Sequence, residues 1–128
     1  MPVTSVGVDI CDINRLRKIE EKFKDRFLQK IFTPKEIAYC EKKHNKHSSY
    51  AARFAAKEAF LKAIGTGLRD GFQWKDIEIE NDHLGKPYFK FYGQTAKFIA
   101  KYDVHLSLSH TDKDAIAFVI LEGDPFLS

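Results

Sequence analysis

Three charged residues stand among apolar neighbours and could carry chemistry. Two of them, Glu58 and Lys62, belong to the stretch RFAAKEAFLKAIGTG, which runs from Arg53 to Gly67. Its apolar residues fall nearly all round a helix, a pattern typical of a helix that is covered on most sides. Charges on such a helix are paired, extend to water or bind something. The i,i+4 spacing of Glu58 and Lys62 also fits a plain ion pair, worth only about 0.2–0.5 kcal/mol when exposed.

The third charged residue is Asp9, near the end of a predicted first strand, Val3 to Ile10, that we expect to be mostly buried. Asp12 is the better candidate to cap the helix that follows, so the sequence suggests no structural role for Asp9. If Asp9 and Glu58 meet in space, their carboxylates repel unless a proton or a cation lies between them.

A cation between two carboxylates would define the chemistry of such a site. Hard oxygen ligands without His or Cys nearby suit Mg²⁺, which keeps several waters and recruits substrate phosphates. Lys62, one turn beyond Glu58, could then reach a phosphate oxygen of the same ligand. Asp9 and Glu58 are therefore the predicted metal ligands, and with Lys62 they form the predicted catalytic set of a phosphoryl-transfer site.

Other polar residues are weaker candidates. Arg53 and Lys57 form a second i,i+4 pair on a different side of the same predicted helix, and a bound anion or surface solubility explains them about equally well. His110 ends the alternating run VHLSLSH, where a polar ligand could reach it. The turn GKP, Gly85 to Pro87, would gain a role only from its position. Three histidines in polar segments receive no role: His44, His47 and His83.

Composition places the chain among soluble globular proteins. Its 128 residues are 44% hydrophobic and 30% charged, and a net charge of +3 with a pI near 8.8 suits an anionic partner without choosing one. Cys11 and Cys40 have neither metal-site spacing nor the number of a disulfide framework, so reduced thiols are expected. The N-terminus lacks a leader pattern and no apolar run approaches a membrane span. These features predict a cytoplasmic protein with a single domain over residues 1–128.

The periodicity of the chain predicts an α+β fold. A helical period begins at Ile13, whereas alternating, β-rich runs dominate the second half. The predicted order is β-α-α-α-β-β-α-β-β, with a mostly antiparallel sheet wrapped around the long apolar helix. The runs that predict the later elements are WKDIEIE, YFKFY, QTAKFIAKY, VHLSLSH and AIAFVIL.

Capping residues indicate where several elements begin and end. The segment FTPKE has the pattern of a capping box, so Glu36 is expected to cap its own helix. The polar run KHNKHSS is predicted to be a loop in which Ser48 or Ser49 caps the long helix, and that helix should end at Gly65 or Gly67. The tail EGDPFLS is expected to be loose.

Taken together, these segments resemble the holo-acyl-carrier-protein synthase family of phosphopantetheinyl transferases. The resemblance runs in register over almost the whole chain, from about Val6 to Glu122. It rests on GVDICDINRL, which holds Asp9, on IFTPKE and above all on RFAAKEAFLKAIGTG, which are followed by DIEI, GKP and LSLSH. One such motif alone would be weak, whereas several in order at fitting intervals are specific.

The resemblance implies transfer of 4′-phosphopantetheine from coenzyme A to a serine of apo acyl carrier protein, with release of adenosine 3′,5′-bisphosphate, in fatty acid biosynthesis. It implies that Asp9 and Glu58 bind Mg²⁺ and that Lys62 contacts a coenzyme A phosphate. Glu58, or a metal-bound water beside it, would take the serine proton. The expected coenzyme A contacts are Arg53, Lys62, Gly85, Lys86, Pro87, Ser109 and His110.

The resemblance also concerns partners. It implies a homotrimer with active sites at subunit interfaces, which would explain a helix that is apolar nearly all round. Acyl carrier proteins are acidic, and the first predicted helix places Arg15, Arg17 and Lys18 on its outer face. We therefore expect Arg15 to dock the carrier protein, although a solvated helix face is the commoner fate of such charges. Neither nucleic acid nor a membrane is an expected partner.

Two other functions fit parts of the pattern. Another Mg²⁺-dependent phosphate-ester enzyme, such as a nucleotide hydrolase, would be expected to carry a Walker motif or a larger cluster of carboxylates, and the sequence has neither. A non-catalytic module that binds nucleotides or acidic proteins would have no use for Glu58, because an unneutralised carboxylate repels phosphate.

Overall fold

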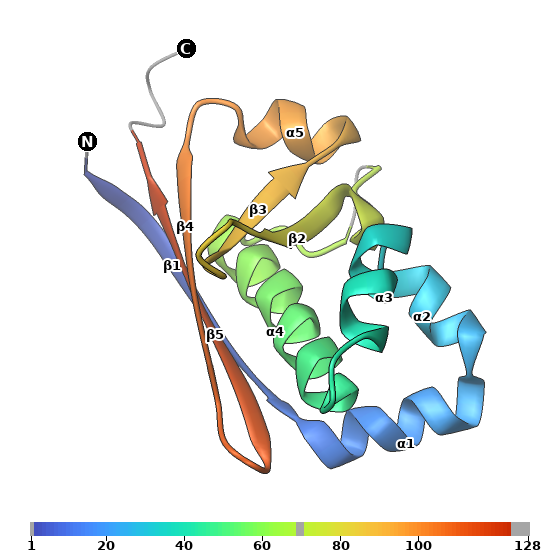
Figure 1. The fold of residues 1–128 in the computed structure, drawn as a ribbon. Coiled ribbons are helices and arrows are strands. Elements are labelled where there is room, and N and C mark those ends of the chain that lie inside the picture. Colours follow the sequence, from blue (N-terminus) through green and yellow to red (C-terminus); the bar gives the residue numbers. More distant parts are fainter. Residues whose placement is uncertain (1, 69–70, 124–128) are drawn as a thin grey trace.

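The computed structural model describes residues 2–68 and 71–123 (Figure 1). Within the described residues, four α-helices rather than the expected three lie between the first and second strands. The helical segment after the first strand is divided at Lys24, which adopts a positive φ of 54°. No helix within the described residues is long and apolar enough to cross a membrane. The elements are β1 (Val3–Asp12), α1 (Ile13–Phe23), α2 (Asp25–Ile31), α3 (Pro34–Glu41), α4 (Lys46–Ile64), the 3₁₀ turn η1 (Trp74–Asp76), β2 (Ile77–Asn81), β3 (Pro87–Phe91), α5 (Gly93–Ile99), β4 (Asp103–His110) and β5 (Asp114–Glu122).

The strands pair antiparallel, as predicted, but they form two sheets. β5 lies between β1 and β4 in a three-stranded sheet, and β2 pairs with β3 in a two-stranded sheet. Figure 1 shows the long helix α4 between the larger sheet and the helices α2 and α3. The smaller sheet packs on α4 through Phe60, whose ring contacts those of Phe89 and Phe91. The predicted α+β fold with antiparallel strands around a long buried helix is confirmed.

The long helix α4 is covered on most sides, and 11 of its 19 residues are buried. It begins earlier than predicted, because the side chain of Asn45 accepts a hydrogen bond from the Ser48 backbone N–H and caps the helix. The prediction that Ser48 or Ser49 would cap it is therefore wrong. The helix ends at Gly65, whose left-handed φ of 76° a residue without a Cβ adopts at little cost.

Part of the predicted loop before α4 is helical. His47 lies in the first turns of α4, and its Nδ1 is 2.8 Å from Glu20 Oε2 of α1. This contact joins the start of α4 to the end of α1. The expectation that His47 lies in a polar loop is therefore wrong.

β1 packs directly on the backbone of α4. A Cβ added at Gly7 would lie 2.0 Å from the carbonyl oxygen of Ala59 and 2.8 Å from the backbone nitrogen of Ala63, so only glycine fits there. Ser5 Oγ strengthens the contact by donating to the Ala63 carbonyl at 2.7 Å. This close approach brings Asp9, two residues after Gly7, next to the same helix.

The opposite face of β1 is open, which corrects the expectation of a mostly buried strand. Its valines and Ile10 are 51–63% exposed, and Phe118 of β5, which pairs with Val8, is 40% exposed. Gly7 is the buried residue of this strand, since the alternation of a strand directs its neighbours Val6 and Val8 to the other face. The larger sheet thus presents an apolar strip to solvent.

Candidate functional site

Asp9 and Lys62 meet where β1 crosses the last turns of α4. Lys62 Nζ donates to Asp9 Oδ1 at 2.9 Å and to the carbonyl of Val8 at 3.1 Å. The Lys62 side chain is 57% exposed, so it holds Asp9 from the solvent side. Hydrogen bonding to Asp9, with its charge, raises the pKa of Lys62. The ammonium therefore stays charged, and Asp9 has a partner that the sequence did not reveal.

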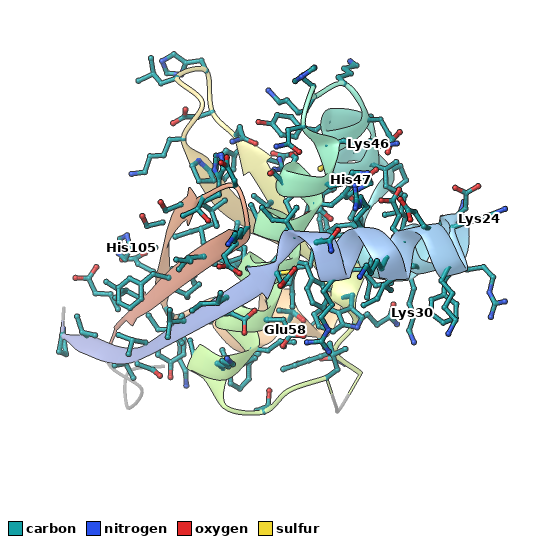
Figure 2. All side chains as sticks on the ribbon, turned by 90° about the horizontal axis from the view of Figure 1, so that it is seen from below. Lys24, Lys30, Lys46, His47, Glu58 and His105 are labelled. Carbon is teal, nitrogen blue, oxygen red and sulfur yellow. The ribbon has the colours of Figure 1, made fainter. Side chains whose placement is uncertain are left out.

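Glu58 lies one turn before Lys62 on α4 and faces the same end of β1. Figure 2 shows it beside β1, close to where that strand passes into α1. Burial raises the pKa of the Glu58 carboxyl, and the charge of Asp9 raises it further, against the opposing charge of Lys62. The ion pair of Lys62 is with Asp9 on another element, not with its helical neighbour Glu58. The i,i+4 ion pair between Glu58 and Lys62 that their spacing allowed is therefore not formed.

The donor set fits a hard divalent cation. Asp9 and Glu58 supply carboxylate oxygens, and burial, followed by the charge of Asp9, raises the pKa of Glu58, so a cation beside it would stabilise its ionised form. The nearby thiol of Cys11 is a poor ligand, because burial, followed by Asp9 and Asp12, raises its pKa to about 11. Among the described residues, no group of three or more His, Cys, Asp or Glu side chains is arranged so that it could hold a metal ion by itself. Two carboxylates suit Mg²⁺, which completes its shell with water and substrate phosphates.

Glu58 borders two depressions in the surface. On one side is a groove of about 370 Å³ between β1, α1 and α4, which Asp9 and Arg15 also line. On the other side is a depression of about 420 Å³, lined by Lys62, Trp74 and the turn after α4. A phosphate ester in either depression would contact Glu58.

Most of the expected coenzyme A contacts line a different cavity, of about 450 Å³. Arg53 is its buried centre: Nη2 donates to Asn81 Oδ1 at 2.7 Å, and the guanidinium stacks over Tyr39 at 4.0 Å from the ring centre. Its buried Nε has no partner among the described residues. The guanidinium nevertheless places a positive charge in the wall of this cavity, which suits an anionic ligand. The predicted residues that share this cavity are Arg53, Gly85, Pro87, Ser109 and His110.

Two expected contacts, Lys62 and Lys86, do not line this cavity. Lys62 lies at the other site with Asp9. Lys86 is exposed in the turn between β2 and β3, where its backbone N–H donates to Asp82 Oδ1 and its carbonyl accepts from the Asp82 N–H. The turn needs Gly85, whose φ is 88°. Nothing in these contacts fixes the Lys86 ammonium, which is free to reach a ligand beyond the turn.

One chain does not bring the two groups of predicted residues together. The cavity around Arg53 is lined by neither Asp9, Glu58 nor Lys62. Arg53 and Glu58 are five residues apart on α4, which separates them by about 140° around the axis and about 7.5 Å along it. The metal pair and the expected nucleotide contacts therefore face different sides of the same helix.

The surface placement considered for Arg53 and Lys57 is wrong, because both are buried. Lys57 pairs with Glu36 at 2.7 Å between two fully buried side chains. Glu36 caps its own helix, as predicted, but it also holds Lys57 and accepts from the Ile79 N–H at 2.9 Å. No local signal in the sequence separates Lys57 from Glu58, which also lies between Ala56 and Ala59 but is only partly buried.

The fold and this site define a class of protein. Residues 5–119 match the model of the 4′-phosphopantetheinyl transferase superfamily, and the chain belongs to that family. The holo-[acyl-carrier-protein] synthase of Geobacter sp. (strain M21) is 47% identical over 123 residues, which is 94% of this chain and 98% of that protein. The resemblance inferred from the sequence is thereby confirmed.

Solved structures of holo-[acyl-carrier-protein] synthases have the same fold as this chain. The holo-[acyl-carrier-protein] synthase of Neisseria meningitidis superposes with a TM-score of 0.87 at 35% identity, over 94% of this chain and 99% of that one. The synthase of Bacillus anthracis, solved in complex with CoA (3′,5′-ADP), gives a TM-score of 0.79 at 35% identity, over 95% and 98% of the two chains.

Proposed function

We propose that this protein transfers 4′-phosphopantetheine from coenzyme A to a serine of apo acyl carrier protein, in the service of fatty acid biosynthesis. The serine oxygen forms a bond to the phosphorus that bears the pantetheine arm, the P–O bond to the adenosine half breaks, and adenosine 3′,5′-bisphosphate leaves. The observation that carries this proposal is the meeting of Asp9, Glu58 and Lys62 at the edge of an open groove. The family and the named relatives point to the same reaction.

Each residue of this set has a distinct part in the proposed reaction. Glu58 is placed to accept the serine proton, directly or through a water beside it, and its raised pKa makes it a stronger base than an ordinary carboxylate. Lys62 stays charged and is exposed, so it can place positive charge beside the phosphate that becomes more negative as it leaves. Asp9 and Glu58 would hold Mg²⁺, which offsets charge on the pyrophosphate oxygens when bound.

The nucleotide end of coenzyme A is assigned to the cavity around Arg53. Its guanidinium is fixed by Asn81 and Tyr39, so it offers charge without further ordering. His110 and Ser109 at the end of β4, and the turn that contains Lys86, border the same space or lie next to it. We assign the 3′-phosphate to this basic group.

A homotrimer would unite the two groups of residues. Within one chain they face different sides of α4, so a coenzyme A molecule that touches both would have to lie between two copies. The apolar strip of β1, with Val6, Val8 and Ile10, and of Phe118 on β5 is a surface that a second copy could cover. Closed symmetry then repeats the same contact around the assembly.

The carrier protein is assigned to the groove between β1 and α1. Arg15 lines this groove together with Asp9 and Glu58, and Arg17 and Lys18 are exposed on the same helix. In Figure 2, Lys24 lies at the far end of α1, and Lys30 of α2 lies beside α1. An acidic partner docked there would bring its serine within reach of Glu58. We assign the protein to the cytoplasm and treat residues 1–128 as one domain.

Intact-mass spectrometry tests the proposed reaction. The chain is incubated with apo acyl carrier protein, coenzyme A and Mg²⁺, and we expect the carrier to gain one phosphopantetheine arm while an equal amount of adenosine 3′,5′-bisphosphate appears. Cleavage of coenzyme A without a modified carrier would favour a nucleotide hydrolase. Binding of coenzyme A without any product would favour a non-catalytic module.

A further inference from the structure

A fully buried lysine next to Glu58 in the sequence is not used by the proposed reaction. Lys57 Nζ donates to Glu36 Oε1 at 2.7 Å, to the carbonyl of Ile31 at 2.8 Å and to the carbonyl of Trp74 at 3.1 Å. Its side chain has no exposed surface. An ammonium has three N–H donors, and here each has a fixed acceptor.

The acceptors of Lys57 come from separate segments. Ile31 ends α2, Glu36 lies in the first turn of α3, and Trp74 begins η1 after the long connection from α4. Glu36 extends the junction, because it also accepts from the N–H groups of Thr33 and Ile79. One side chain of α4 therefore fixes the backbone of its surroundings at several points.

Trp74 links this junction to the candidate site. Its carbonyl is held by Lys57, its indole packs on Phe54 with ring centres 5.5 Å apart, and it lines the depression that Glu58 and Lys62 share. Phe54 lines the groove on the other side of Glu58. The two rings thus form a wall that borders the site on both sides of its carboxylate.

Stability alone does not account for a lysine at this position. Buried ion pairs are often replaced by apolar residues of similar volume without loss of stability. An apolar side chain could fill the space, but it could not hold the Trp74 carbonyl, the Ile31 carbonyl and Glu36 at once. What Lys57 adds is a fixed position for the backbone of η1.

We propose that Lys57 is a positioning residue, which holds Trp74 against Phe54 and so sets the wall of the site beside Glu58 and Lys62. This inference rests on the proposed transferase function. Small displacements of the groups that orient a substrate cost rate even when every reacting group is present. Lys57 touches no reacting atom and acts through Trp74.

Three variants test the inference. Lys57→Met with Glu36→Gln removes both buried charges together, so that neither is left unpaired. Trp74→Ala removes the wall without touching the ion pair. Tyr50→Phe is the matched control, because Tyr50 OH makes another polar link between α4 and the end of α3, to Glu41 at 2.7 Å, away from the site. Each variant is assayed for folding by circular dichroism and for transfer with coenzyme A and carrier protein varied separately.

The expected result is a kinetic change confined to coenzyme A. In the double variant and in Trp74→Ala, kcat/KM for coenzyme A should fall about 10- to 100-fold, while KM for the carrier protein stays within about twofold. Trp74 is the single tryptophan of the sequence, so acrylamide quenching of its fluorescence reads its exposure directly. Quenching should rise in the double variant and stay at the wild-type level in Tyr50→Phe.

Several outcomes would overturn the inference. Wild-type kinetics in Trp74→Ala would show that the wall does not matter, whether or not the double variant folds. A folded double variant with unchanged quenching and unchanged kcat/KM, or an equal loss in Tyr50→Phe, would assign Lys57 to stability alone. If the wild-type chain itself forms no modified carrier, the proposed function fails, and that failure is distinct from a failure of this inference.

Discussion

Two lysines five residues apart on α4 form ion pairs of opposite character. Lys57 has no exposed side-chain surface and pairs with Glu36, whereas Lys62 is 57% exposed and pairs with Asp9. Burial lowers the pKa of Lys57, but the hydrogen bond that Lys62 donates to Asp9 raises the pKa of Lys62. Both donate to backbone carbonyls as well. The contrast lies in access to water rather than in the contacts themselves.

The difference in access to water gives the two lysines different roles: Lys57 stabilises the fold, whereas Lys62 is available for chemistry. Lys57 has every donor engaged by protein, so a ligand could reach it only by unpacking the core. Lys62 has two protein acceptors and one donor left for water or a phosphate oxygen. The exposed pair of Lys62 and Asp9, the open pair, can exchange partners during a reaction. The buried pair of Lys57 and Glu36, the closed pair, cannot. Substitutions on the two sides should therefore affect different measurements.

The largest loss of transfer activity is expected from substitution of the two carboxylates at the site of the open pair, Asp9 and Glu58. Asp9→Ala and Glu58→Ala should each lower transfer by at least about 10²- to 10³-fold, because preorganised charge at the reacting phosphate is lost. Far-ultraviolet circular dichroism should stay close to wild type. Glu58→Gln should be as inactive as Glu58→Ala, since an amide can neither balance a cation nor accept a proton. Near-normal activity of either alanine variant at saturating Mg²⁺ would disprove the metal assignment.

The closed pair should show the opposite behaviour in a stability measurement. Lys57→Met leaves the buried carboxylate of Glu36 without its cation, and breaking a buried pair in this way costs about 3–5 kcal/mol of unfolding free energy. Urea unfolding followed by circular dichroism measures the loss. Adding Glu36→Gln should recover part of it, because the unpaired charge is then gone. If the single and double variants were equally unstable, the lysine would act through packing and not through charge.

The surroundings of the open pair were more predictable from the sequence than those of the closed pair. Asp9, Glu58 and Lys62 stood out because they are charged residues on apolar elements, and the structure brings them together. The fold class, the element types and the cap of α1 by Asp12 were also predictable, since they depend on local period and local hydrogen bonds.

Contacts between distant segments were not predictable in the same way. Lys57 and Arg53 were considered as a possible surface pair, because their burial depends on α2, α3 and β2, which no local pattern places against α4. The open face of β1 was expected to be buried for the same reason: β-branched residues indicate an apolar surface but not what covers it. The separation of the expected coenzyme A contacts from the metal pair likewise follows from tertiary packing.

A third prediction concerns Lys62 itself. Lys62→Ala should lower kcat more than it raises KM for coenzyme A, because its charge matters most as the leaving phosphate becomes more negative. Its effect on unfolding free energy should be small, about 0–1 kcal/mol, since the Lys62 side chain of this pair is largely exposed to solvent. Steady-state kinetics and urea unfolding measure the two quantities. A raised KM with unchanged kcat would show that Lys62 binds only the ground state.

A fourth, smaller effect concerns the partner at the rim of the groove. Arg15→Glu should raise KM for the carrier protein and leave coenzyme A affinity nearly unchanged, because Arg15 lines the groove on the side of α1. Charge complementarity of this kind mainly raises the association rate and is screened by salt. Added salt should therefore slow the wild type far more than the variant. A wild-type KM in Arg15→Glu at low salt would place the docking surface elsewhere.

The smallest effect expected is a gain of stability on removing the charge of Glu58. Burial and Asp9 raise the pKa of Glu58 in the folded chain above its ordinary value of 4.5, so between these two values the folded state binds more protons than the unfolded state. The unfolding free energy therefore falls as pH rises through that window, and the deficit is complete above the folded pKa. Glu58→Gln removes this unfavourable contribution to the unfolding free energy. In the presence of a chelator at neutral pH, the variant should therefore be more stable than wild type, and the difference in stability should disappear below the unfolded pKa.

Glu41 is the matched control, because its hydrogen bond from Tyr50 lowers its pKa. Glu41→Gln should therefore lose stability at neutral pH. Urea unfolding across pH measures both, and a Glu58→Gln variant no more stable than wild type at neutral pH would mean that the site carries no electrostatic strain for a cation to relieve.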